Sequence, residues 1–344
     1  MTRALVVAAV LSAVSGRAHG DVWRDAIDNG DPNHAQYDHQ LAAGDNFAIQ
    51  ATAVSVTFGI TQRNVDAALL AYNTASKLEP TAAEPYYRAG RVLYAMYFNN
   101  CAHSSQGLLQ PAMLSPLCLD SDPTVFTRDA HAHQIAEDLI ADWDAFEQRA
   151  PLDPRLTTGF LFERAILHTK LATPEHWARA AKDYEAILDR DDFVDRDSTV
   201  SGNLAETYMM LGRLDDAIEM YRRSLREGSP DAMYGLAVAL DRDDQGEQAK
   251  DYIREYGIEQ YNSFSGKISS GQWFFVPDGE RFYYVALIEE AFGDTDTALA
   301  DWQHYIASGA HPQFQPRAKA HVAALEKLPP PKKHALEELD ESAP

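Results

Sequence analysis

The chain has 344 residues, of which 45% are apolar and 10% aromatic. This is enough apolar material for folded domains, so global disorder is excluded. The 52 Asp and Glu residues outnumber the 30 Lys and Arg residues and give a formal net charge of −22. A surface this acidic repels nucleic acid and anionic lipid, so we expect neither as a general partner.

The first 20 residues are typical of a secretory signal peptide. Arg3 supplies the positive start, residues 4–14 form an apolar stretch, and the small residues Ala18 and Gly20 end the region. The apolar stretch is too short to cross a bilayer as a mature helix, and the alternative is a buried N-terminal helix. We expect cleavage near Gly20 and a periplasmic or secreted protein whose mature chain does not insert into a membrane.

A three-residue pattern recurs along the rest of the chain and predicts helices. A small residue is followed four positions later by a large apolar residue, and three positions after that by a third residue. The copies are Ala68-Tyr72-Ala75, Ala136-Ile140-Trp143, Ala180-Tyr184-Ile187, Ala217-Tyr221-Ser224, Ala249-Ile253-Tyr256 and Ala298-Trp302-Tyr305. Steps of three and four place each set on one helix face, where the small residue permits close approach of a neighbouring helix.

A second pattern precedes most of these copies and predicts a first helix for each unit. It occurs as Tyr86-x-x-Ala89-Gly90-x-x-Leu93, Leu167-His168-x-x-Leu171, Leu204-Ala205-x-x-Tyr208, Leu236-Ala237-x-x-Leu240 and Phe282-x-x-Val285-Ala286. Between the two patterns, Gly212, Gly246 and Gly293 predict turns, because glycine accepts the left-handed conformation that ends a helix.

Together the two patterns resemble the tetratricopeptide repeat (TPR) family, whose helix pairs stack into a right-handed superhelix. The clearest copy covers residues 204–230, and the resemblance extends over most of residues 45–310 with roughly six units. It implies an all-α fold over residues 21–310, a right-handed α-solenoid of stacked helix-turn-helix repeats. The family mostly scaffolds proteins and binds peptides, so the resemblance specifies a fold more than a function.

Residues 95–128 interrupt the repeats and predict an insertion, because they contain three prolines and both cysteines of the chain. In an oxidising compartment, Cys101 and Cys118 are expected to form a structural disulfide. The alternatives are a redox pair or a metal site with His103.

Residues 262–280 are the second interruption. They are rich in Ser and Gly around Trp273, Phe274 and Phe275, which predicts a loop or short hairpin whose aromatic rings fill the groove between two repeats. A final capping helix is expected over residues 311–328. Three prolines then end it and leave residues 329–344 as an acidic flexible tail.

The sequence lacks the usual catalytic and phosphate-binding motifs, so we expect no enzyme, no catalytic residue and no cofactor. His131 and His133 are two positions apart, which places them on different faces of a helix and suits a metal poorly. Asp241-x-Asp243-x-Gln245-Gly246 resembles the first half of an EF-hand loop, but Tyr252 stands where a bidentate Glu is needed. We therefore expect no metal site.

The TPR resemblance implies that ligand contacts come from the inner face of the first helix in each unit. The matching positions are Tyr87, Arg91, Tyr94, Phe162, Glu206, Met209, Tyr234 and Tyr283. Exposed aromatic rings suit a peptide-binding groove because they bury much area at low entropic cost; the alternative is that the rings pack against neighbouring helices. Since only Arg91 falls where some family members hold a peptide carboxylate, we expect a protein or peptide partner of basic or apolar character.

The expected function is an exported scaffold that binds a partner protein or peptide in the concave groove of the solenoid. Two alternatives stay open at this point. One is an enzyme acting on envelope polymers through an unrecognised carboxylate pair, and the other is a receptor for a small ligand or calcium.

Overall fold

The computed structural model describes residues 32–52, 58–99, 125–190, 199–269, 275 and 277–328, and all regular secondary structure in these ranges is helical. The chain divides into two compact units. Unit 1 comprises Met1–Asp122 and Gln134–Pro154, and unit 2 comprises Pro123–His133 and Arg155–Pro344. The predicted signal peptide (1–20), Cys101, Cys118 and the predicted acidic tail (329–344) lie outside the described residues.

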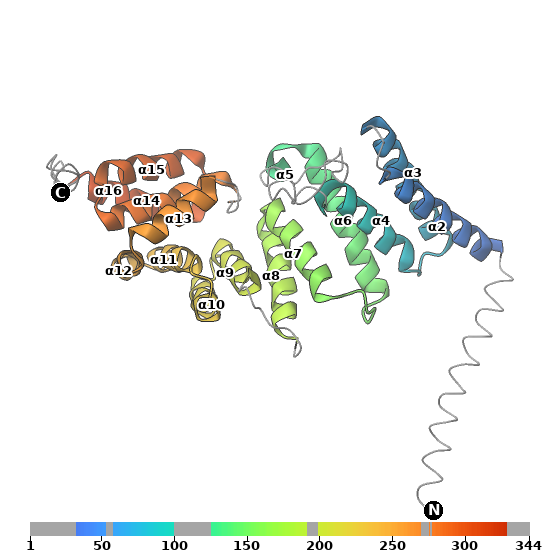
Figure 1. The fold of residues 1–344 in the computed structure, drawn as a ribbon, viewed down its shortest axis with the longest axis horizontal. Coiled ribbons are helices and arrows are strands. Elements are labelled where there is room, and N and C mark those ends of the chain that lie inside the picture. The colour runs from blue at the N-terminus through green and yellow to red at the C-terminus, as the bar shows by residue number, and fades with distance from the viewer. Residues whose placement is uncertain are drawn as a thin grey trace, which may run out of the picture. The chain divides into compact units, whose positions relative to one another are not determined.

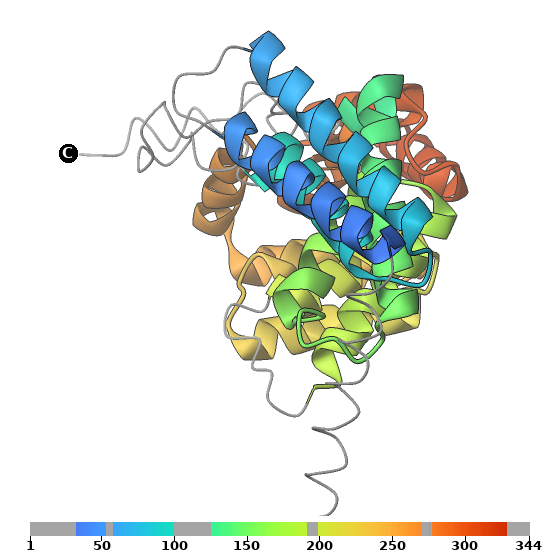
Figure 2. The ribbon, with the colours of Figure 1, turned by 90° about the vertical axis from the view of Figure 1, so that its right-hand side faces the viewer.

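Unit 1 is a group of packed helices. Helices α2 (Pro32–Ala51) and α3 (Phe58–Leu78) lie side by side, as Figure 2 shows, and α3 also packs on α4 (Glu84–Tyr94). Ala95–Asn99 continues α4 as a π-helix, η1. From residue 134 onward, α6 (Ala130–Arg149) also belongs to this unit. Helices α4 and α6 approach closely because Gly90 leaves room for the indole of Trp143, with which any Cβ at position 90 would clash.

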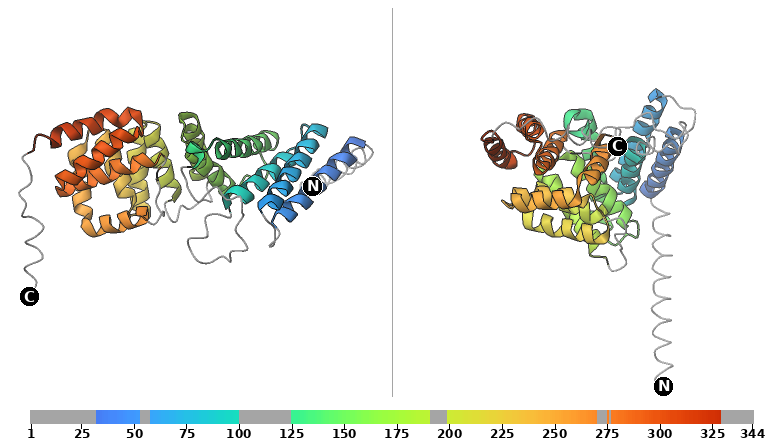
Figure 3. Two further views of the ribbon diagram at one scale, coloured as in Figure 1. Left: turned by 90° about the horizontal axis from the view of Figure 1, so that it is seen from above. Right: turned by 60° about the vertical axis from the view of Figure 1, so that its left-hand side comes forward.

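Unit 2 is a series of helices in which each member packs against a neighbour in the sequence (Figure 1). Its described elements are α5 (Val125–Arg128), α7 (Thr158–Leu171), α8 (Pro174–Leu188), α9 (Thr199–Met210), α10 (Leu214–Glu227), α11 (Ala232–Arg242), α12 (Gly246–Tyr256), α13 (Ile258–Ser269), η4 (Asp278–Glu280), α14 (Arg281–Phe292), α15 (Thr295–Ser308), η5 (Pro312–Phe314) and α16 (Gln315–Leu325). From α7 to α12 every helix contacts its successor; α12 then packs on α14, α14 on α15, and α15 on α16 (Figure 3). Packed helix pairs of this kind are consistent with a helical repeat fold.

Local sequence signals set the ends of several helices in unit 2. The hydroxyls of Thr157 and Thr173 accept hydrogen bonds from the backbone N–H groups of Phe160 (3.2 Å) and His176 (3.3 Å), which caps the first turns of α7 and α8. At the other end, α10 and α15 stop at glycines in the left-handed conformation, Gly228 and Gly309. Short turns join α7 to α8 and α10 to α11, and the helices of each pair contact each other.

The recurring small–large pattern lies on the buried faces of helices, as the sequence predicts. Its first members, Ala68, Ala180, Ala217, Ala249 and Ala298, all have exposed fractions of 0%. The large second members are buried against them, and Trp302 and Tyr184 are also fully enclosed. The first and second positions of the pattern therefore belong to the buried interior of the helix pairs, as predicted.

Two of the three predicted turn glycines have the expected conformation. The φ angles of Gly212 and Gly293 are 74° and 84°, at the ends of first helices. Gly246 does not, because it begins α12; the left-handed residue of that turn is Asp244, with φ 58°. Gly246 is needed for space instead, since a Cβ there would meet the side chains of Arg317 and Asp241.

The structure differs from the sequence prediction over the first part of residues 262–280. Where a loop or hairpin is expected, α13 continues to Ser269, because the fully buried Phe264 on this helix stacks on Tyr234 at 4.3 Å. Phe275 is buried against the ring of Tyr284 at 4.8 Å, while Trp273 and Phe274 lie outside the described residues.

Helix α16 lies within the range where a capping helix is expected, and the short 3-10 helix η5 precedes it. Its buried residues are Ala318, His321 and Leu325, so one position of its inward stripe is a titratable side chain. None of the described helices combines the length and the apolar composition that crossing a membrane requires.

Candidate functional site

The predicted binding residues of unit 1 share one face of α4. Tyr87, Arg91 and Tyr94 are spaced at helical intervals, and all three are half-buried. The ring of Tyr87 packs on Phe146 at 4.9 Å, and that of Tyr94 on Trp143 at 5.4 Å. The Arg91 guanidinium lies over the Tyr94 ring at 5.3 Å. This face therefore holds two phenol rings and one cation on a fixed support.

Two further predicted residues are half-buried in unit 2. Phe162 on α7 meets Tyr184 edge-on at 6.1 Å. Glu206 on α9 accepts hydrogen bonds from Tyr221 (2.5 Å) and Tyr284 (2.8 Å), which belong to α10 and α14. Burial, together with the charge of Glu206, raises the pKa of both phenols well above the ordinary value. Glu206 thus joins three helices.

The last three predicted residues are inside unit 2 and form no open groove. Met209, Tyr234 and Tyr283 have exposed fractions of 0%, 2% and 0%. Tyr234 stacks on Phe264, and the hydroxyl of Tyr283 donates to Asp241 at 2.7 Å. For these residues the structure favours the alternative that the side chains pack against neighbouring helices. For Tyr234 the reason is that α13 and α14 pack on α11, all of whose residues are buried. Tyr283 is on α14 and is enclosed by the rings of Trp302 and Tyr305 on α15.

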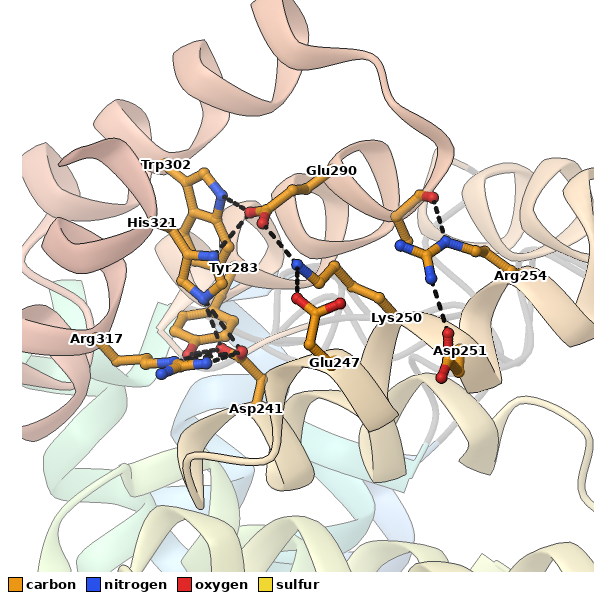
Figure 4. A network of polar contacts seen from close by, with 11 residues as sticks. Asp241, Glu247, Lys250, Asp251, Arg254, Tyr283, Glu290, Trp302, Arg317 and His321 are labelled. Atoms are coloured by element: carbon orange, nitrogen blue, oxygen red, sulfur yellow. Dashed lines mark hydrogen bonds and ion pairs between the residues drawn. The ribbon is translucent and has the colours of Figure 1, made fainter. Parts of the chain in front are cut away.

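A buried carboxylate, Asp241 at the end of α11, is the centre of a polar network that the sequence analysis misses (Figure 4). Its exposed fraction is 0%. It accepts hydrogen bonds from Arg317 Nη2 (2.6 Å), His321 Nε2 (2.9 Å) and the Tyr283 hydroxyl (2.7 Å). Burial raises the pKa of Asp241, but the hydrogen bonds and charges of His321 and Arg317 outweigh burial and hold it well below the ordinary value.

His321 connects this carboxylate to a second one on α14. Its Nδ1 donates to Glu290 Oε2 at 2.7 Å, and its ring stacks on Trp302 with centroids 4.3 Å apart. Burial lowers the pKa of His321, but hydrogen bonds to the two carboxylates raise it overall to about 9. Glu290 also contacts Lys250 Nζ (3.3 Å) and Trp302 Nε1 (3.2 Å). At neutral pH an imidazolium therefore lies between two carboxylates.

The geometry of Asp241 also bears on the EF-hand-like spacing. The carboxylate that would be the first calcium ligand is bound to Arg317 and His321, so its oxygens face cationic side chains. Within the part of the chain that the structure describes, no group of three or more His, Cys, Asp or Glu side chains is arranged to hold a metal ion.

A second buried cluster consists of Arg242, Glu280 and His311. Their exposed fractions are 7%, 1% and 4%. Arg242 Nη2 donates to Glu280 Oε1 at 2.5 Å, and Glu280 Oε2 lies 3.7 Å from His311 Nε2. Four atoms of the cluster have no hydrogen-bond partner: Arg242 Nε and Nη1, Glu280 Oε2 and His311 Nε2. Each buried group left in this state costs about 1–3 kcal/mol, so the cluster is incomplete as it stands.

Aromatic rings enclose the incomplete cluster. The Arg242 guanidinium lies between the rings of Tyr283 (4.3 Å) and Phe314 (4.0 Å), and the ring of Trp177 is 5.5 Å from that of His311. Burial raises the pKa of Glu280 to about 7, although Arg242 opposes this shift. Burial, aided by Arg242, lowers the pKa of His311 to about 3, so this imidazole is neutral.

These two clusters have weak signatures in the sequence. Arg317 and His321 are four positions apart, which places them on one face of α16 and is the one signal that pairs them. Arg242, Glu280 and His311 lie in a helix end, a 3-10 turn and a loop, with no spacing that connects them. Their meeting depends on how α8, α11, α14 and α15 pack.

No protein-family model and no curated protein matches the sequence. The described part of the chain is all-helical with many packed helix pairs, which is consistent with a helical repeat fold.

Proposed function

We propose that the protein is an exported scaffold of the TPR type, a right-handed α-solenoid that binds a partner protein or peptide. The packed helix pairs, the fully buried alanines of the repeat pattern and the left-handed turn glycines Gly212 and Gly293 support the repeat assignment. The expected signal peptide supports export. The mechanism is equilibrium binding, in which no covalent bond changes.

The observation that carries the binding proposal is the half-buried face of Tyr87, Arg91 and Tyr94. Because Phe146 and Trp143 support the two phenol rings, little side-chain entropy remains to be lost when a partner covers them. Tyr and Arg are the side chains most enriched among residues that dominate binding energy. The face can therefore bury apolar area and direct one hydrogen-bonding cation.

The partner chemistry follows from the charge of the chain. With a formal net charge of −22, long-range attraction favours a basic partner, and the aromatic face favours apolar side chains. A peptide that presents apolar residues next to Lys or Arg matches both features.

The test is affinity capture from the native envelope fraction with the mature protein, followed by titration of the purified partner. Tyr87→Ala and Tyr94→Ala each remove one supported ring from the α4 face. Leu152→Ala is the matched control, because Leu152 is an apolar residue of unit 1 with 96% of its side chain exposed. Thermal melts establish that each variant folds.

We expect one partner to bind the wild type and Leu152→Ala equally and to bind both α4 variants about tenfold more weakly or worse. Equal recovery by all four proteins would place the binding surface elsewhere and refute the proposal for α4.

A further inference from the structure

The incomplete cluster of Arg242, Glu280 and His311 is the largest departure from polar satisfaction among the described residues. Its unpartnered atoms include donors (Arg242 Nε–H and Nη1–H), an acceptor (Glu280 Oε2) and one group, His311 Nε2, that is either according to its tautomer. The atoms are close together, because Glu280 contacts Arg242 directly and its Oε2 is 3.7 Å from His311 Nε2. Buried polar groups of this kind are normally paired.

The missing partner must supply both an acceptor and a donor. A carbonyl oxygen matches the N–H groups of Arg242, and an adjacent N–H matches Glu280 Oε2. The protein groups already form an ion pair with little net charge, so a neutral guest avoids burying a further charge in this aromatic surrounding. A primary amide carries both groups on one planar unit.

We propose that the Arg242–Glu280–His311 cluster is a binding site for a small neutral solute that bears a primary carboxamide group. Its carbonyl oxygen accepts from Arg242, and its NH2 group donates to Glu280 Oε2. The rings of Tyr283, Phe314 and Trp177 pack against Arg242 and His311 and bound the site, so the solute must be small.

Exposed residues lie next to the site in the sequence. Pro312 and Gln313, directly after His311, are exposed, and so is Asp278, two residues before Glu280. His311 is one of three non-glycine residues with positive φ (38°) in the described chain, a conformation that a β-carbon disfavours. The segment that carries His311 is thus both near the surface and held against its local backbone preference.

The experiment uses the full chain with acetamide as the probe and acetate as a charged comparator of the same size. Thermal melting and ligand-observed NMR measure binding at millimolar concentrations. We expect acetamide to raise Tm with a saturable dependence on concentration and to show saturation-transfer signals, and acetate to do neither.

Glu280→Gln reverses the site chemistry and supplies the decisive comparison. The variant replaces the carboxylate with an amide and leaves Arg242 as an uncompensated cation, so we expect preference for acetate over acetamide. Glu175→Gln, at an exposed position of α8, is the matched control and keeps the wild-type preference. If Glu280→Gln does not fold, His311→Asn tests the site instead. Asn tolerates a positive φ, and its shorter side chain removes the imidazole nitrogen of His311 from the site. We then expect acetamide to bind several-fold more weakly.

Three results would overturn the proposal. One is the absence of a saturable effect of acetamide on the wild type, which would assign these atoms to internal water. Another is an equal response to acetamide and acetate. The third is a folded Glu280→Gln variant that keeps the wild-type preference. None of these results bears on the α4 face, so the binding of a protein partner is tested separately.

Discussion

Replacing Asp241 with Asn removes the negative charge from the centre of the network in Figure 4 while keeping the size of the side chain. Asp241 accepts from two cationic groups, Arg317 and His321, and is itself fully buried. Breaking one side of a buried ion pair costs about 3–5 kcal/mol. The Arg317 side chain is 26% exposed and regains some hydration, so we expect the lower end, about 3 kcal/mol.

Urea denaturation followed by circular dichroism measures this loss. With an m-value of about 1–3 kcal/mol per molar, typical of small domains, a loss of about 3 kcal/mol should lower the midpoint by about 1–3 M. Hydrogen exchange supplies a local readout, and the amides of α16 should exchange faster relative to those of α7. The matched control is Asp244→Asn, because Asp244 also contacts Arg317 (3.1 Å) but its side chain is 91% exposed. We expect the control to lose at most about 1 kcal/mol.

A loss below about 1 kcal/mol for Asp241→Asn, or equal losses for both variants, would refute the reasoning. Either result would mean that the buried carboxylate does not hold α16 in place through its charge.

Three further outcomes follow from the structure. The pKa of His321 is raised to about 9, so the stability it contributes is fully present below about pH 6.5 and is lost as the pH rises through 9. The difference in unfolding free energy between wild type and His321→Gln should therefore shrink from pH 6.5 to pH 9. A constant difference would rule out an imidazolium. His168 behaves in the opposite sense, because burial, with the charges of His176, Arg164 and Arg179, lowers its pKa to about 3. Between pH 7 and pH 5 the free energy of unfolding of wild type should therefore fall by about 2 kcal/mol more than that of His168→Phe. Parallel pH profiles of the two proteins would contradict this. Gly235→Ala should lower the free energy of unfolding, measured by urea denaturation, by about 1–3 kcal/mol, because a Cβ there clashes with the ring of Tyr221. Gly266→Ala is the control on α13; its Cβ would have open space around it, so this variant should be neutral or stabilising. The reverse order would show that α10 and α11 can separate freely.

Much of the helix packing could be predicted from the sequence, because a buried helix face repeats every three or four residues. Ala180-Tyr184-Ile187 is an example: all three residues are buried on α8, as the pattern predicts. The limit of this reasoning is seen at residues 262–269, where Ser and Gly predict a loop. The burial of Phe264 against Tyr234 is a tertiary contact that overrides this local preference.

The candidate sites were less predictable, for a physical reason. The family resemblance places Tyr283 on an inner helix face, but it cannot tell whether another helix covers that face. Tyr283 is covered, with Trp302 at 4.7 Å and Tyr305 at 5.0 Å from its ring. Likewise, the charge of Asp241 depends on Arg317 and His321, which are 76 and 80 residues away in the sequence. Such distant pairings leave no periodic trace.

The attachment of α16 to α11 has a consequence for how the chain folds. In a helical repeat fold most contacts join neighbours in sequence, so segments can fold or fray one after another. The pairing of His321 with Asp241 joins residues 80 positions apart and raises the contact order of this end of unit 2. Helices α11 to α16 should therefore unfold as one cooperative block. A chain truncated before α16 would leave Asp241 without its two cationic partners and the rest of this block open to proteases.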